Sequence, residues 1–252
     1  MRIQLIVSCF LLLACVDQTQ AQAPVLIVTE DLPPLQIDKE GRLYDGLAYQ
    51  KVKRLVNTAK LDATWLVAPW ARAYNIALST PNVLLFSVVR TPKREEKFTW
   101  IGQLFLMDLF LVSLHSRRIK ATTLEQAKHL LIATKRSDVV LNYLEAEGFV
   151  TGKNMMVVRD TKATYDALLK GRVDLVPANK IMIDSYCAKA NCSLQDFNFS
   201  ISLPDMEQDF YLAVSKGSDP EVINALRQAY QLHEASEAKE AKAVIEAVEA
   251  SK

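Results

Sequence analysis

Short, continuous apolar runs that alternate with segments of helical periodicity constrain the fold of this chain more than any other feature. The runs cover residues 25–29, 84–89, 105–113, 129–134, 154–159, 173–178 and 210–215. Continuous apolarity is typical of strands buried on both faces, as in parallel sheets. The segments between the runs predict helices over residues 44–57, 70–79, 137–147, 161–170, 179–190 and 219–233. Strands that alternate with helices in this way predict an α/β fold.

Residue types suited to helix ends support two of these boundaries. Ser137 and Asp138 are candidate N-caps for a helix that stops at Gly148. A second helix is expected to start at Thr161 and to stop at Gly171.

Length and charge narrow the class of protein. The chain has 252 residues, 50% of them apolar, which suits an ordinary globular protein of one or two domains. Its 30 Lys and Arg residues against 29 Asp and Glu give a formal net charge of +1. This balance argues against a nucleic-acid partner, which would require a basic surface. The alanine-rich, charged tail over residues 234–252 predicts a solvated helix docked on one side.

The first residues have the pattern of an export signal. Arg2 precedes an apolar run over residues 5–16 that is too short to span a bilayer. We expect a signal peptide over residues 1–21, cleaved after Ala21, and a periplasmic location. The alternative is a lipoprotein anchored at Cys15.

The two cysteines outside the signal are close together in the sequence. Cys187 and Cys192 reach an oxidising compartment if the chain is exported, and their spacing permits a disulfide worth about 2 kcal/mol. A metal site would need more ligands nearby, and His115, His129 and His233 are scattered. We expect a disulfide and no metal.

Three stretches, taken in order, carry a resemblance that covers nearly all of the mature chain. The first is "VLIVTEDLPPL" followed by "GRLYDGLAYQKVKRL", the second is "RTPKREEKFTWIG", and the third runs from "TLEQAKHLLIATKRSDVVLNYL" through "ALLKGRVDLVPANK" to "DFYLAVSKGSDPEVINAL". Together they resemble the type II periplasmic solute-binding proteins, in particular the family that captures polar amino acids for ABC importers (bacterial extracellular solute-binding protein family 3).

This resemblance implies a fold and a function. The fold would be periplasmic binding protein-like II, with two α/β lobes joined by two hinge strands that close over a ligand. Residues 24–108 and 210–252 would form lobe 1, and residues 109–209 would form lobe 2. The function would be the capture of a small polar ligand, bearing a carboxylate, for an ABC importer, by a monomer without a cofactor.

Two arginines stand in the second stretch. Arg94 falls on the family position whose guanidinium grips the ligand's carboxylate, a task suited to a rigid and permanently charged fork. The alternative makes Arg94 a surface partner of Glu95 or Glu96. Arg90 is a further candidate, although solvated charge is the commonest state of such a residue.

Other candidates line the predicted cleft from the first lobe. Glu30 follows the first strand, where open α/β sheets place ligands, and could accept a hydrogen bond from a ligand amine; a cap or surface role is the alternative. An apolar wall would come from Trp70, Tyr74 or Tyr44, each of which is also a candidate core residue.

In the second lobe, residues 135–138 lie between a strand and a helix start, where free backbone N–H groups favour an anion. Ser137 matches a small hydroxyl position of the family. Arg136 stands where relatives commonly have glycine, so it either enters the cleft and selects an acidic ligand or turns outward. Asn179 occupies the place of an aspartate that pairs with the ligand's ammonium group, which makes a standard amino acid less secure as the ligand.

Other functions remain open at this stage. A protein that presents its ligand to a membrane receptor is one alternative, and a cyclohexadienyl dehydratase-like enzyme on the same fold is another. The sequence has no nucleophile elbow, zinc-binding helix or phosphate loop. We therefore expect a binding protein and not an enzyme.

Overall fold

The computed structural model describes residues 24–206 and 208–250 of the chain. The predicted signal peptide, its cleavage after Ala21 and the alternative lipid anchor at Cys15 lie outside the described residues. Among the described residues, no helix combines the length and the apolar composition that crossing a bilayer requires.

A five-stranded sheet forms the core of the first lobe. Its strand order is β4-β1-β5-β12-β6, with β1 parallel to β4 and β5, and β12 antiparallel to β5 and β6. The strands are β1 (Val25–Thr29), β4 (Ala63–Val67), β5 (Val83–Val89), β6 (Phe98–Met107) and β12 (Gln208–Ser215). Every residue of the central strand β5 is buried, as its continuous apolarity predicts.

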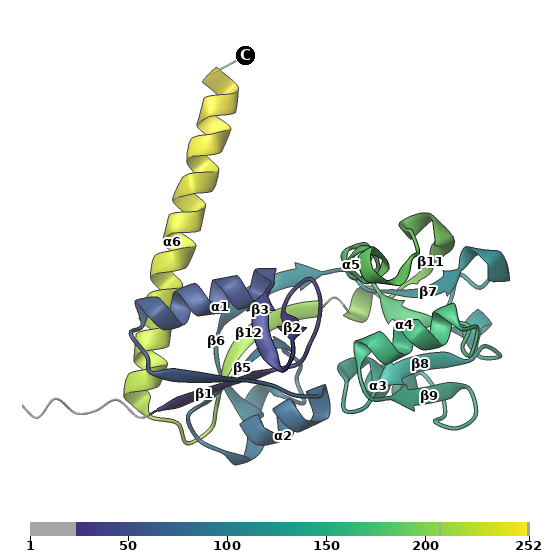
Figure 1. The fold of residues 1–252 in the computed structure, drawn as a ribbon, viewed down its shortest axis with the longest axis horizontal. Coiled ribbons are helices and arrows are strands. Elements are labelled where there is room, and N and C mark those ends of the chain that lie inside the picture. Colours follow the sequence, from purple (N-terminus) through teal and green to yellow (C-terminus); the bar gives the residue numbers. More distant parts are fainter. Residues whose placement is uncertain (1–23, 207, 251–252) are drawn as a thin grey trace, which may run out of the picture.

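Three helices and a hairpin complete the first lobe (Figure 1). They are β2 (Ile37–Lys39), β3 (Arg42–Asp45), α1 (Leu47–Thr58), α2 (Trp70–Ser79) and α6 (Pro220–Ala250). The far end of α6 extends well beyond the rest of the lobe. Its nearer part is tied to α1, because Lys51 pairs with Glu234 and Glu237 at 3.1 Å each. The tail is thus the continuation of the predicted helix over 219–233.

The second lobe repeats this arrangement in smaller form. It contains β7 (Phe110–Leu114), β8 (Ile132–Lys135), β9 (Met155–Val158), β10 (Val176–Ala178) and β11 (Phe197–Ser202), with α3 (Val139–Ala146), α4 (Thr161–Leu169) and α5 (Lys180–Ala190). Strands β8 and β9 pair in parallel, while β10 and β11 flank β7 antiparallel. A bridge between Ile132 and Leu175 connects the two groups.

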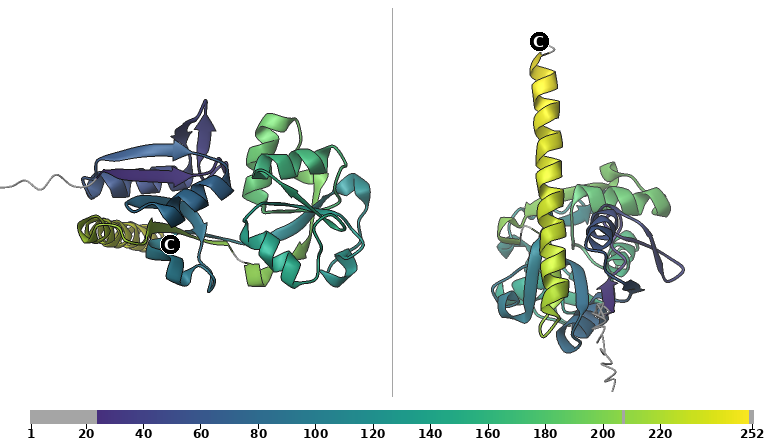
Figure 2. Two further views of the ribbon diagram at one scale, coloured as in Figure 1. Left: turned by 90° about the horizontal axis from the view of Figure 1, so that it is seen from below. Right: turned by 90° about the vertical axis from the view of Figure 1, so that its left-hand side faces the viewer.

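Two segments cross between the lobes, where β6 leads to β7 and β11 leads to β12 (Figure 2). The predicted single strand over 105–113 is therefore wrong. It consists of the end of β6 and the start of β7, separated by Asp108 and Leu109. Met107 of β6 and Leu111 and Val112 of β7 are buried in the two lobes, whereas Leu106 is 59% exposed although it belongs to the same apolar run.

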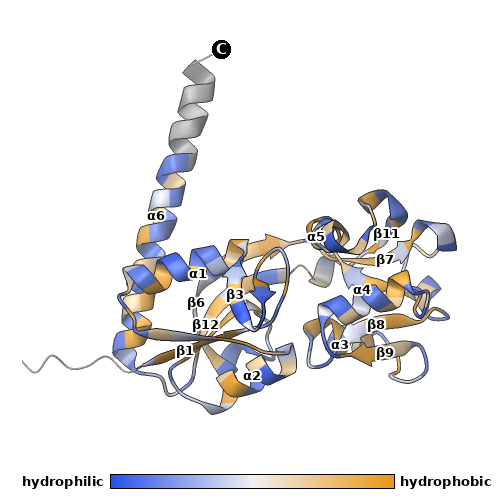
Figure 3. Cartoon of the chain, viewed as in Figure 1, coloured by the Kyte–Doolittle hydropathy of each residue, from blue (hydrophilic) through white to orange (hydrophobic). Residues whose placement is uncertain are grey.

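The apolar runs did not predict the strands whose sequences mix polar with apolar residues. β4, β11 and the β2-β3 hairpin are only partly buried, and their sequences mix apolar with polar residues. In Figure 3 apolar colour is concentrated in the central strands, whereas the helices carry both polar and apolar colour. The partly buried strands lie at sheet edges, where one side is left to solvent.

Candidate ligand-binding cleft

A cavity of about 40 Å³ lies between the two lobes. Residues at the carboxyl ends of two strands line this cavity. Glu30 follows β1, and Lys135 is the last residue of β8. This is the edge at which open α/β sheets bind ligands. The polar and aromatic side chains that line it include Glu30, Trp70, Arg94, Thr134, Lys135 and Asp138.

Lys135 joins two carboxylates across the cavity. Its Nζ lies 2.6 Å from Oε1 of Glu30, in the first lobe, and 3.2 Å from Oδ2 of Asp138, in its own lobe. All three side chains are nearly buried. Asp138 is held in place because its other oxygen caps α3, accepting a hydrogen bond from the Val140 N–H at 2.9 Å. The Lys135–Glu30 pair is an ion pair between the lobes.

Burial and charge act in opposite directions on this ion cluster. Burial favours the neutral form of Lys135, but the carboxylates of Glu30 and Asp138 outweigh it and raise the pKa of Lys135. Burial raises the pKa of Glu30, and the nearby Lys135 opposes this without cancelling it. Lys135 therefore stays charged, whereas Glu30 takes up a proton more easily than an exposed glutamate.

Arg94 also lines the cavity and is buried, with 5% of its surface exposed. Its guanidinium donates hydrogen bonds to the carbonyl oxygens of Val89 at 3.1 Å and Ser137 at 3.2 Å. It also stacks on the rings of Tyr74 at 4.8 Å and Trp70 at 5.4 Å. A guanidinium has five N–H donors, more than these two bonds use.

Arg94 is cationic yet has no carboxylate partner among the described residues. Burial lowers its pKa, whereas Tyr74, through charge and a hydrogen bond, and the charge of Asp138 oppose this without cancelling it. Its two carbonyl partners carry no net charge. A buried cation in this state is suited to bind an anionic group that enters the cavity.

The carbonyl of Ser137 ties the second lobe to the first. It accepts a hydrogen bond from Nε1 of Trp70 at 2.9 Å as well as the one from Arg94. Ser137 has a left-handed backbone with φ 59°, which is uncommon for a residue other than glycine. The turn aims its carbonyl at the first lobe.

Two polar atoms of the cavity wall are buried without a hydrogen-bond partner. They are Oε2 of Glu30 and Oγ1 of Thr134. Leaving such atoms unsatisfied costs about 1–3 kcal/mol each, so they favour a ligand that brings hydrogen-bonding groups. Both belong to residues that are less than 5% exposed.

No family model matches the sequence, and no curated protein matches it. Solved structures do resemble it. A histidine kinase sensor domain with similarity to periplasmic binding proteins has a TM-score of 0.76 at 15% identity, over 87% of this chain and 94% of that one. An ancestral arginine-binding protein bound to arginine has a TM-score of 0.72 at 14% identity, over 84% and 92%. The amino acid ABC transporter substrate-binding protein AbpA from Streptococcus pneumoniae, bound to L-arginine, has a TM-score of 0.69 at 12% identity, over 84% and 90%.

The chain has the fold of the type II periplasmic binding proteins. The predicted fold class is thereby confirmed. At these identities the likeness concerns the fold, so the roles of individual residues rest on their own contacts.

Within this binding-protein fold, the predicted site residues divide into two groups. Arg94, Glu30 and Trp70 line the cavity, and Tyr74 supports Arg94 from behind without lining it. Ser137 contributes through its carbonyl, as described above.

The remaining candidates lie elsewhere. Arg136 is exposed and does not line the cavity. Arg90 is exposed and does not line the cavity. It pairs with Glu95 at 2.5 Å and stacks on the ring of Trp100 at 5.3 Å. Asn179 is buried but caps α5, accepting a hydrogen bond from the Met182 N–H at 2.9 Å. Tyr44 is 67% exposed on β3.

The side chains of Lys135, Asp138 and Thr134 were not predicted as cleft contacts. Their positions at the end of β8 and the start of α3 were the available signal. In this stretch the sequence pointed instead to backbone N–H groups, the Ser137 hydroxyl and the Arg136 side chain. In the described part of the chain, no three His, Cys, Asp or Glu side chains gather as a metal site.

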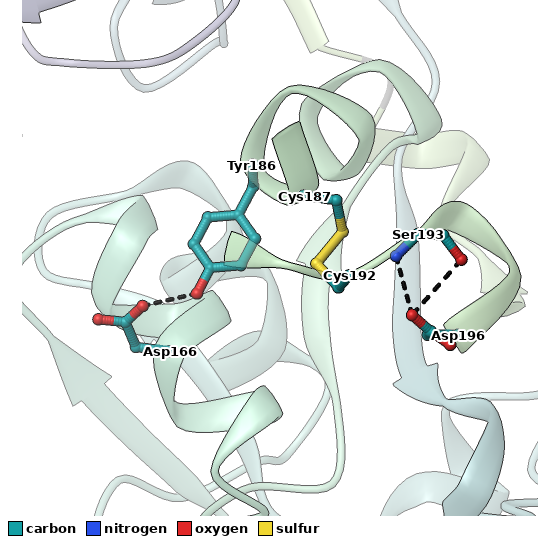
Figure 4. Close-up of a disulfide and its surroundings, with 6 residues drawn as sticks. All are labelled: Asp166, Tyr186, Cys187, Cys192, Ser193 and Asp196. Carbon is teal, nitrogen blue, oxygen red and sulfur yellow. Dashed lines mark hydrogen bonds between the residues drawn. A yellow bond between two sulfur atoms is a disulfide. The ribbon is translucent and has the colours of Figure 1, made fainter. Parts of the chain in front are cut away.

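The predicted disulfide joins Cys187 in α5 to Cys192 in the turn after it, with a Cα–Cα distance of 4.7 Å (Figure 4). The neighbouring Tyr186 donates a hydrogen bond at 2.6 Å to Asp166 of α4, which pins α5 against α4. Because α5 carries Met182 into the cavity wall, the disulfide supports the second lobe's side of the cleft.

Proposed function

We propose that this chain is an exported solute-binding protein that holds a small, polar, carboxylate-bearing ligand between its lobes. It delivers that ligand unchanged to an ABC importer and acts as a monomer. The observation that carries the proposal is Arg94, a buried cation that lines the inter-lobe cavity without a carboxylate partner among the described residues.

The binding step follows from the contacts of both lobes. The ligand's carboxylate accepts hydrogen bonds from Arg94, and other polar groups of the ligand reach Glu30 and Thr134. Because the cavity is lined from both lobes, a bound ligand favours the closed arrangement over an open one. Closure of this kind is what a transporter partner would recognise.

The solved structures support binding over catalysis, since two of the three compared above are named as binding proteins holding arginine. Arginine itself does not suit this cleft. The cavity of about 40 Å³ is small, and the carboxylates of Glu30 and Asp138, which a cationic ligand would need, already contact Lys135.

The proposal is tested by thermal-shift and calorimetric titration of the exported protein with small carboxylates and amino acids. We expect at least one acid to raise the melting temperature of the protein in a saturable way. Mass spectrometry should then detect that acid unchanged after incubation with the protein. Conversion of the acid into a product would favour an enzyme instead.

Arg94→Ala is expected to weaken that binding by about 10- to 150-fold, because charged hydrogen bonds contribute roughly 1.5–3 kcal/mol. Arg90→Ala is the matched control, since Arg90 is exposed and pairs with Glu95. The melting temperature of each unliganded variant reports on its folding. Equal affinity of the Arg94→Ala variant and the unmodified protein would remove Arg94 from the site.

A further inference from the structure

We propose that Lys135 is a built-in ammonium group that determines specificity, so that the ligand is a short hydroxycarboxylate and not the corresponding amino acid. This inference rests on the proposed function and names the ligand class of the same cleft.

The first step is the charge balance of the cavity. Its charged side chains are Glu30, Asp138, Lys135 and Arg94, two negative and two positive. Lys135 contacts both carboxylates, at 2.6 Å and 3.2 Å. A ligand ammonium next to Glu30 would compete with Lys135 for the same carboxylate and would be repelled by the Lys135 ammonium. This repulsion opposes the attraction to Glu30 and Asp138, so the ligand ammonium gains little for the hydration that it loses.

The second step is the hydrogen-bonding need of the cavity wall. Oε2 of Glu30 has no partner and, as a carboxylate oxygen, accepts hydrogen bonds. A ligand hydroxyl donates to it while carrying no charge into the cavity, so its desolvation costs less than that of an ammonium. The unpartnered hydroxyl of Thr134 can donate to the same ligand.

The third step is the opposite treatment of a ligand carboxylate. Arg94 donates to the carbonyl oxygens of Val89 and Ser137, and no described carboxylate forms an ion pair with it. The ligand's carboxylate supplies that pair. The cavity thus favours a negative group at Arg94 and a neutral donor at Glu30.

The fourth step is size. The cavity measures about 40 Å³, on a scale where one water molecule needs roughly 10–15 Å³. Room for about three such positions suits an acid of two or three carbon atoms. Apolar side chains that include Val89 and Phe210 line the rest of the wall and can contact a methyl group.

The test uses matched acids that differ only in a hydroxyl or an ammonium group: glycolate with glycine, and L-lactate with L-alanine. Calorimetry on the unmodified protein should show at least tenfold tighter binding of a hydroxy acid than of its amino acid. This comparison does not depend on any variant folding.

Substitution of Lys135 then tests its role. In Lys135→Ala, Glu30 and Asp138 lose their cation, and the amino acid should gain at least tenfold relative to the hydroxy acid. Lys135→Arg keeps the charge and should keep the original preference. Lys153→Ala, which removes an exposed lysine elsewhere in the lobe, should also keep it.

The outcomes separate the two proposals. If an amino acid binds the unmodified protein as tightly as its hydroxy counterpart, or if Lys135→Ala leaves the ratio unchanged, this inference fails while the proposed function stands. If no small carboxylate or amino acid binds any of these proteins, the proposed function fails and the inference fails with it.

Discussion

Glu30 is the residue whose protonation most directly affects the contact between the lobes. Burial raises its pKa above its ordinary value of 4.5, Lys135 lowers it, and Asp138 and Asp160 raise it further. Because the pKa is higher in the folded state, protonation of Glu30 stabilises the fold at pH below 4.5. That contribution is lost as the pH rises through the folded pKa.

We therefore expect mild acidification to favour the closed arrangement of the lobes. Opening would expose Glu30 and return its pKa toward the ordinary value, so the closed form binds the proton more tightly. Small-angle scattering of the unliganded protein should show a smaller radius of gyration on mild acidification. Glu30→Gln, which carries no charge at this position, should have the smaller radius already at pH 7 and change little on acidification. An identical pH response in both proteins would contradict this account.

At the residue scale, the sequence predicted cavity residues that belong to recognisable stretches, such as Arg94 and Glu30. It did not predict that the Lys135 side chain enters the cleft. That orientation depends on Glu30, which lies 105 positions away and in the other lobe. A charged side chain has no pattern that reveals such a partner, and solvation is its commonest state.

At the scale of elements, Asn179 has a role that the sequence did not separate from ligand binding. Its side chain caps α5, and its Nδ2 lies 3.4 Å from the Met107 sulfur. Asn179→Ala should lower the free energy of unfolding by about 1 kcal/mol, whereas Asn179→Asp should be close to neutral because aspartate caps equally well. Chemical denaturation measures both. A strong loss of ligand affinity in Asn179→Asp, with stability unchanged, would place Asn179 in the site instead.

Strands and helices were predictable where the apolar run or the helical periodicity was uninterrupted. β1, α2 and the wholly buried β5 match the predicted residues closely, and α4 begins at Thr161 as expected. β4 and β11 were missed because edge strands mix polar and apolar residues. The run over 105–113 was misread because two strands from different sheets follow one another with only two residues between them.

At the scale of the whole molecule, the resemblance to solute-binding proteins implied two lobes, but the sequence did not reveal the contacts that close the cleft. Among the described residues, the contacts that join the lobes at the cavity include the Lys135–Glu30 ion pair and the hydrogen bonds from Trp70 and Arg94 to the carbonyl of Ser137. They couple ligand binding to closure, because the same side chains line the cavity. Their geometry exists only once both lobes are folded and docked.

The most direct test of this account is a crystal structure of the protein grown with the tightest-binding small carboxylate. We predict density for the acid between the lobes, with its carboxylate on the Arg94 guanidinium and its hydroxyl on Glu30. Density for the acid outside the cleft, or in the cleft with Arg94 turned away from it, would contradict the account.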